Sequence, residues 1–173
     1  MLSETENKRQ LLDLEFLGGI LSDAGVETTL YPKSEQLPVS FLSIGLPELP
    51  QKRETFLQLM YIPTSGLLEE TNILQFFIQL PNSDQQNTEA IASLLSVLNT
   101  RTALGYFGLG EDGHLFYRYN FVMHRFQVPE KLQFLEVTNL VIQVFLAYGL
   151  TVLEFHDGNI SLEQAIGQLK GTA

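Results

Sequence analysis

Cysteine is absent from this chain of 173 residues, and positive charge is scarce. Without cysteine the protein can form no disulfide, perform no thiol catalysis and build no zinc or iron–sulfur site with sulfur ligands. Lys and Arg number 10 against 20 Asp and Glu, and only Lys8-Arg9 and Lys52-Arg53 are neighbours in the sequence. Because clustered cations bind phosphate backbones and anionic membranes, we expect no nucleic acid and no membrane surface among the direct partners.

Long hydrophobic runs are missing as well. No unbroken apolar stretch reaches the ~18 residues that span a bilayer. The first residues, MLSETENKRQ, lack the basic and apolar regions of a secretion signal. The sequence therefore predicts a cytoplasmic protein without membrane insertion. Its length and its 45% hydrophobic content predict a single domain over residues 1–173 with a substantial core.

Hydrophobic spacing along the chain predicts separate groups of helices and strands. We expect an N-terminal helix within 1–25, a meander of four strands within 26–80, a helix at 88–100, a β-hairpin at 103–122, a long helix at 129–148 and a tail at 150–173. Gly149 is expected to close the long helix, TVLEFHDG (151–158) is a candidate for one more short strand, and Ser161 is expected to cap a short final helix. Short connections favour antiparallel pairing. The order α-ββ(ββ)-α-ββ-α predicts an α+β fold, in which the helices are segregated to one side of an antiparallel sheet.

The stretch GLGEDG (108–113) fits G-x-G-x-x-G, the phosphate-binding fingerprint of dinucleotide-binding domains. In such a site the glycines follow a strand and open a helix, whose N-terminus holds the pyrophosphate. Here the next residues, HLFYRYNFV, alternate as a strand does, and Glu111 and Asp112 would place two carboxylates against the phosphate. We therefore interpret the stretch as the turn of a hairpin with Gly113 at positive φ, and predict no cofactor.

Candidate catalytic and metal-binding groups are few. The three histidines show no H-x-x-x-H spacing, and no serine lies in a G-x-S-x-G elbow. The cluster Glu154, His156 and Asp157 supplies an alternative, because Glu154 and His156 would share one side of a strand and contribute to a metal or small-molecule site. On motif grounds we predict no catalytic, cofactor-binding or metal-binding residue, and a protein that is not an enzyme.

Apolar residues are more numerous than a sheet covered on one face requires. The strand FLQLMYI (56–62) is apolar on both faces, and the long helix carries two apolar stripes, so it is expected to be buried on more than one side. One compact core would absorb these residues; the alternatives are a homodimer interface or a groove for an apolar peptide. The residues that we expect at such a partner-binding or dimer interface are Phe77, Tyr117, Tyr119, Val137, Leu140, Val141, Val144 and Tyr148.

The segment from Leu95 to Ala147 carries motifs of a known family. Its motifs are Leu98-Asn99 at the end of a helix, the turn 111–113, Arg118 within FYRYNF, and VPEKL (128–132) at the opening of the long helix. With these motifs the segment resembles YbjN-type domains, a family described as bacterial sensory transduction regulators. Val128 departs from the pattern, since Ser or Thr would stand there as a helix cap. The helix-first order also resembles the type III secretion chaperone-like fold.

The resemblance implies a small bacterial, cytosolic domain that is dimeric and binds another protein, and it carries no catalytic residues over. In the chaperone relatives, apolar patches on the sheet and helices hold an extended client. We therefore expect a non-enzymatic protein-binding module, chaperone-like or regulatory, that acts as a homodimer and engages a protein or peptide partner, by strand addition among other contacts. The alternatives are a small-molecule- or metal-binding regulator or minor enzyme that uses Glu154, His156 and Asp157, and a structural subunit of a larger complex.

Overall fold

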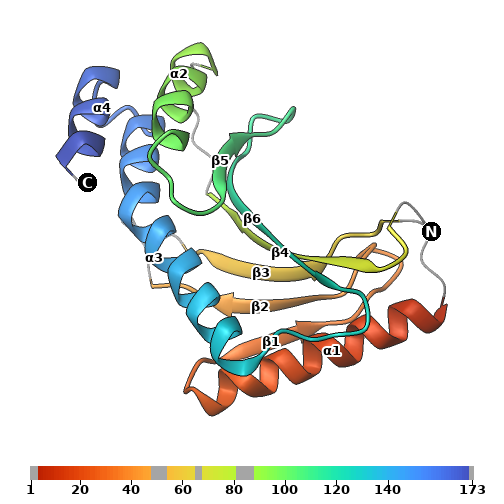
Figure 1. Cartoon of the computed structure of the whole chain (residues 1–173). Coiled ribbons are helices and arrows are strands. Elements are labelled where there is room, and N and C mark those ends of the chain that lie inside the picture. Colours follow the sequence, from red (N-terminus) through yellow and green to blue (C-terminus); the bar gives the residue numbers. More distant parts are fainter. Residues whose placement is uncertain (1–3, 48–53, 65–67, 81–87, 172–173) are drawn as a thin grey trace.

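The computed structural model describes residues 4–47, 54–64, 68–80 and 88–171 (Figure 1). The elements in chain order are α1 (Glu4–Asp23), β1 (Thr28–Tyr31), β2 (Phe41–Gly45), β3 (Phe56–Tyr61), β4 (Thr71–Gln79), α2 (Thr88–Asn99), β5 (Tyr106–Leu109), β6 (Leu115–His124), α3 (Lys131–His156) and α4 (Leu162–Gly171).

The six strands form one antiparallel sheet in the order β1-β2-β3-β4-β6-β5. The first four strands are a meander, as short connections between antiparallel neighbours predict. β6 then pairs with β4 from Thr71↔His124 to Gln79↔Phe116, and β5 closes the far side of β6. This sheet and the four helices confirm the predicted α+β fold.

One face of the sheet carries the hydrophobic core. Alternate residues of each strand point to it, and Leu57, Leu59 and Tyr61 of β3 are buried there. α1 lies across β1, β2 and β3, α2 contacts β5, and α3 runs along β6 and meets α1 near its own N-terminus (Figure 1). The helices thus lie on one side, as the sequence predicted.

The opposite face of the sheet, which we call the open face, carries no helix. By strand alternation and pairing register, its residues on the six strands are Thr29, Tyr31, Phe41, Ser43, Gly45, Phe56, Gln58, Met60, Thr71, Ile73, Gln75, Phe77, Gln79, Tyr106, Gly108, Phe116, Arg118, Asn120, Val122 and His124.

The hairpin turn between β5 and β6 has the predicted form. Gly110 N–H donates to His114 O at 2.8 Å, Gly113 N–H donates to Gly110 O at 3.0 Å, and Gly113 has φ 83°. β6 begins at Leu115, where a nucleotide-binding site would need a helix. The interpretation of GLGEDG as a turn is therefore confirmed.

The long helix extends beyond its predicted end. α3 runs from Lys131 to His156, so the predicted helix 129–148 is too short and the predicted strand at 151–158 is wrong. Val152 and Leu153 are buried and continue the core-facing side of the helix, which outweighs the helix-ending tendency of a glycine. Gly149 lies inside the helix, at a position where an added Cβ would come within 2.9 Å of the Phe145 ring.

The caps of α3 and α4 explain where both helices start. Glu130 is the N-cap of α3, and its carboxylate accepts a hydrogen bond from Gln133 N–H at 3.1 Å, so no Ser or Thr is needed at Val128. Ser161 and Gln164 form the predicted capping box at α4: Gln164 N–H donates to Ser161 Oγ at 3.2 Å, and Ser161 N–H donates to Gln164 Oε1 at 2.8 Å.

Candidate interaction site

One edge of β6 is left without a neighbouring strand. β5 pairs with β6 only from Leu115 to Arg118, whereas β4 pairs with β6 as far as His124. Residues 119–124 therefore pair on one side and have a free edge on the other, among the residues that the structure describes.

Hydrogen bonds at the two ends of β6 show which backbone groups face this edge. Leu80 N–H donates to Leu115 O, and Arg125 N–H donates to Glu70 O, both at 2.9 Å. In an antiparallel ladder both backbone groups of a residue point to the same side, and the side alternates along the strand. Odd-numbered residues of β6 thus face β4. The even-numbered residues whose N–H and C=O groups both point to the free edge are Asn120 and Val122.

The neighbouring edge of β5 is closed by a side chain. Asn99, at the end of α2, donates from Nδ2 to Phe107 O at 2.9 Å and accepts from Phe107 N–H at 2.8 Å. The amide takes the place of a strand and protects the edge from pairing with another chain. No such contact covers Asn120 and Val122 within the described part of the chain.

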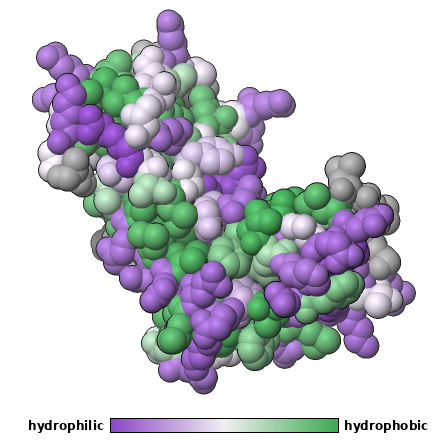
Figure 2. All heavy atoms as spheres, in the orientation of Figure 1, coloured by the Kyte–Doolittle hydropathy of each residue, from purple (hydrophilic) through white to green (hydrophobic). Residues whose placement is uncertain are grey.

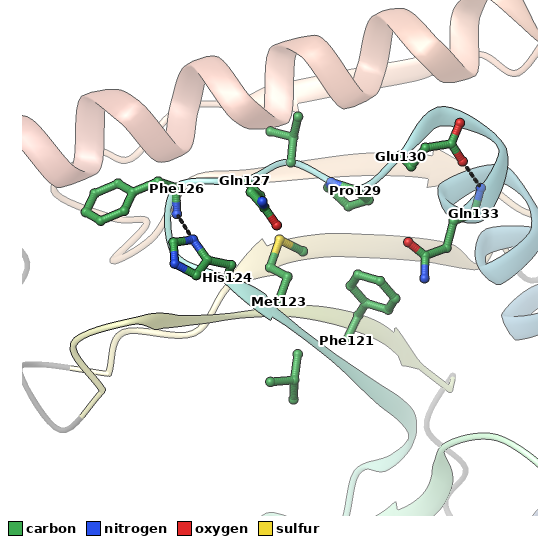
Figure 3. A pocket seen from close by; sticks show the side chains of 10 residues that line it. Phe121, Met123, His124, Phe126, Gln127, Pro129, Glu130 and Gln133 are labelled. Carbon is green, nitrogen blue, oxygen red and sulfur yellow. Dashed lines mark hydrogen bonds between the residues drawn. The ribbon is translucent and has the colours of Figure 1, made fainter.

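An open groove lies beside the free edge of β6 (Figure 3). Its other wall is the segment 125–130 between β6 and α3, which we call the strap, together with the start of α3. The groove has a volume of about 680 Å³, and its lining residues are Phe121, Val122, Met123, His124, Phe126, Gln127, Val128, Pro129, Glu130 and Gln133.

The strap is held in place by contacts with α1 and with the loop that precedes β4. Arg125 forms an ion pair with Glu6 at 2.8 Å and donates to Glu69 O at 3.2 Å. The guanidinium of Arg9 lies 5.3 Å from the ring centroid of Phe126. Because distant segments anchor it at several points, the strap forms a fixed wall of the groove.

Polar groups of α1 are partly buried beneath the strap. Burial raises the pKa of the Asp13 carboxyl, an effect that the nearby Arg9 partly offsets, with Arg9 Nε 3.9 Å from the carboxylate. In β3, burial also raises the pKa of the Tyr61 hydroxyl. None of these three groups is among the residues that line the groove.

Large apolar side chains are exposed around the groove. Val122 is 63% exposed, Phe126 70% and Leu132 67%. A large contiguous patch of exposed apolar side chains marks a site of interaction, most often with another protein. Sequence reasoning missed Phe126 because the strap has neither strand nor helix periodicity; the apolar residues between the hairpin and the helix were the available signal.

The outward side of α3 is also partly apolar. Leu132, Leu140 and Leu150 are exposed on it, and hydrophobic surface extends along this helix in Figure 2. By length and composition α3 is the one described helix that could cross a membrane, and 33% of its most apolar window is buried. Core helices of soluble proteins meet the same criterion, so the absence of membrane insertion stays a prediction.

The structure divides the residues that we expected at an interface into three groups. Tyr117, Val141 and Val144 are buried in the core and offer no surface to a partner, which corrects the prediction for these three. Tyr119, Val137 and Tyr148 are half-buried against the core, Phe77 is half-buried on the open face, and Leu140 is exposed. Periodicity could not separate these groups, because it does not show which apolar stripe a neighbouring element covers.

The cluster Glu154, His156 and Asp157 does not have the geometry that we expected. The first two residues lie in α3, where positions two apart point to different sides, so they share no side. His156 is buried, and Asp157 caps the helix C-terminus. A pocket of about 270 Å³ lies beside His156. The described residues hold no group of three His, Asp or Glu placed to bind a metal ion.

Comparisons with known proteins give a structural likeness at low sequence identity. No family model matches the chain, and no curated protein matches it. Among solved structures the chain is similar to YbjN from E. coli, described as a putative transcription regulator, with 12% identity, 84% of this chain and 90% of that chain covered, and a TM-score of 0.43. Family membership therefore stays a prediction.

Proposed function

We propose that the protein is a non-enzymatic protein-binding module that holds an extended polypeptide segment in the groove beside β6 and acts as a homodimer. The observation that carries the proposal is the free edge of β6 next to a groove lined by exposed apolar side chains. A strand added there would bond to the backbone of Asn120 and Val122 and place alternate side chains against the strap.

The charge of the groove limits the segment that it accepts. Its lining contains Glu130 and no Lys or Arg. An acidic segment would be repelled, so we expect a neutral or basic segment with apolar residues at alternate positions. Backbone hydrogen bonds then give affinity, and the apolar lining gives selectivity.

Val122→Pro tests strand addition directly. Proline removes the N–H group that faces the free edge, while the hydrogen bonds of β6 to β4 come from the odd-numbered residues and remain. We expect proteins that co-purify with the wild-type chain from its native cells to be recovered at least about tenfold less with Val122→Pro, because a bonding strand needs that donor. Quantitative mass spectrometry measures the recovery.

Val122→Thr is the matched control, since threonine keeps the N–H group and strand preference. It should retain the partners. Both variants must show the wild-type unfolding transition. Equal recovery of the same proteins by wild type and by a folded Val122→Pro variant would contradict strand addition.

Homodimer formation is assigned to the outward side of α3. There Leu140 is exposed on a rigid helix, and a carboxylate at its position would be buried at the interface without a partner. We expect a dimer in light scattering at micromolar concentration and a monomer for Leu140→Glu. Leu12→Glu, an equally exposed position on α1, should stay dimeric; a wild-type chain that is monomeric at all concentrations would refute the dimer.

The pocket beside His156 favours a second candidate, a small-molecule- or metal-binding regulator. The buried imidazole and the apolar wall formed by Ile91, Ile160 and Leu162 suit a small ligand with one polar group. Thermal unfolding with added Zn²⁺, Ni²⁺ or nucleotides tests it, since any ligand that binds the folded state raises Tm.

A further inference from the structure

Acidic residues are excluded from the sheet. None of the residues in β1 to β6 is Asp or Glu, although the chain has 20 of them. Arg118, in the middle of β6, is the one Lys or Arg in these strands. Arg118 is therefore the one Lys or Arg that the strands contribute to the open face, among aromatic, aliphatic, amide and hydroxyl side chains.

Aromatic rings hold the guanidinium of Arg118 in place. Its Cζ lies 4.9 Å from the ring centroid of Tyr106 and 5.4 Å from that of Phe116. Phe116 in turn stacks on Phe77, with centroids 5.6 Å apart. Phe77 and Tyr106 are the cross-strand neighbours of Arg118 on its two sides. The guanidinium is thus fixed by cation–π contacts rather than free to reach a distant carboxylate.

The donors of Arg118 are not used within the described protein. Its Nε is buried and has no hydrogen-bond partner, and no acidic group pairs with the guanidinium. A partly buried guanidinium without a neighbouring anion lowers the stability of the fold, unless a group outside the chain supplies the anion. Because the guanidinium is a planar fork that binds carboxylates through two parallel hydrogen bonds, a carboxylate is the group that fits it.

The surroundings of Arg118 favour a carboxylate flanked by apolar groups. The amides of Gln75 and Asn120 bond to each other at 3.0 Å next to it. Exposed aromatic residues continue to the far strands, where Tyr31 stacks on Phe41 at 4.8 Å. Six strands at ~4.8 Å spacing are about 24 Å wide, which is broader than a small organic acid and suits a protein surface.

We propose that the open face is a second docking surface, which binds a protein segment that presents one Asp or Glu carboxylate between apolar side chains, with the carboxylate held by Arg118. This surface meets the groove beside β6 at Val122, but its charge differs, since the groove favours neutral or basic segments. The net charge of the chain does not prevent it, since salt screens charges more than ~8–10 Å away and no carboxylate lies on the strands themselves.

Selection from a random heptapeptide phage library tests the proposal. We expect the wild-type chain to enrich peptides with Asp or Glu between apolar residues, and Arg118→Gln to lose that enrichment. Arg101→Gln is the matched control, because Arg101 is an exposed arginine away from the sheet and should leave the selection unchanged. Enrichment of the same acidic peptides by Arg118→Gln, or no acidic preference on the wild type, would overturn the proposal.

Calorimetry with one selected peptide gives the second measurement. Replacing its acidic residue by the amide should weaken binding to the wild type about tenfold or more, the range for a lost charged hydrogen bond, and leave binding to Arg118→Gln unchanged. The carboxylate could also come from a small organic acid, and benzoate serves as the probe for this case. If benzoate binds the wild type as tightly as the peptide does, the site is one for small organic acids and the protein-docking proposal fails. Arg118→Lys, which keeps the charge but not the fork, should bind the peptide more weakly than wild type. Circular dichroism establishes that each variant is folded.

Discussion

Replacing Tyr117 by alanine is expected to lower the free energy of unfolding by about 3–5 kcal/mol, the cost of removing a large buried ring. The ring is fully buried and lies 4.8 Å from the ring of Phe107 and 6.4 Å from that of Phe145, centroid to centroid. Tyr117 also donates from its hydroxyl to Leu104 O at 2.6 Å, so the variant loses both packing and a hydrogen bond. Urea denaturation followed by circular dichroism measures the change.

The Tyr117→Phe variant separates the two contributions. It keeps the ring and removes only the hydroxyl, which leaves the carbonyl of Leu104 without this donor and costs about 1–3 kcal/mol. Tyr117 is part of the core, so neither substitution should change partner binding in a folded sample. A Tyr117→Ala variant with wild-type stability would mean that the side chain is not in the core.

Gly105→Ala has the second largest expected effect, a loss of about 2–4 kcal/mol that combines backbone strain with overpacking. Gly105 has φ 70°, a conformation that residues with a Cβ rarely adopt. An added Cβ would lie 2.6 Å from Arg118 O and 2.8 Å from the hydroxyl of Tyr117. Neither group can move away easily, because the first is backbone in β6 and the second is hydrogen-bonded. Chemical denaturation again gives the measurement.

Gly25→Ala is the control that isolates the clash. Gly25 has φ 80° but no atom within 4 Å of an added Cβ, so its substitution should cost only the conformational term of about 1–2 kcal/mol. If the two variants lose the same free energy of unfolding, the close approach of Gly105 to β6 does not contribute to the cost of the Gly105→Ala substitution. A larger loss at Gly105 supports the packing of the 100–105 loop against Tyr117.

β6 takes part in both proposed surfaces because of how a strand is built. Its backbone groups at Asn120 and Val122 face the groove, while the side chains of Phe116 and Arg118 lie on the open face. Tyr117 from the same strand fills the core. Substitutions in this strand therefore need to be chosen by position. Changes at Leu115 and Tyr117 affect the core, changes at Phe121 and Met123 affect the groove, and changes at even positions affect the open face.

The types of most elements follow from the sequence alone. Strand alternation in HLFYRYNFV and the glycine at position 113 were enough to identify a hairpin and to reject a nucleotide site. The absence of cysteine excluded thiol chemistry. These inferences hold because side-chain alternation and positive φ are local properties, decided by residues close together in the chain.

The extent of α3 and the exposure of its residues were decided by packing. Gly149 ends a helix by local preference, yet buried contacts of Val152 and Leu153 carry the helix to His156. Val141 and Val144 have the same apolar character in the sequence as residues of an interface, but in the structure they are buried in the core. Only the positions of other elements show which apolar side of a helix is already occupied.

The candidate sites depend on pairings between distant parts of the chain. The sequence by itself determined the sheet residues, the excess of apolar side chains, and the scarcity of positive charge. The tertiary structure decided that β5 stops at Arg118, that Asn99 closes one edge while Asn120 and Val122 stay open, and that Tyr106 and Phe116 hold Arg118. The physical reason is that strand periodicity is read within a few residues, whereas an edge, a groove or an unpaired charge is defined by what lies next to it in space.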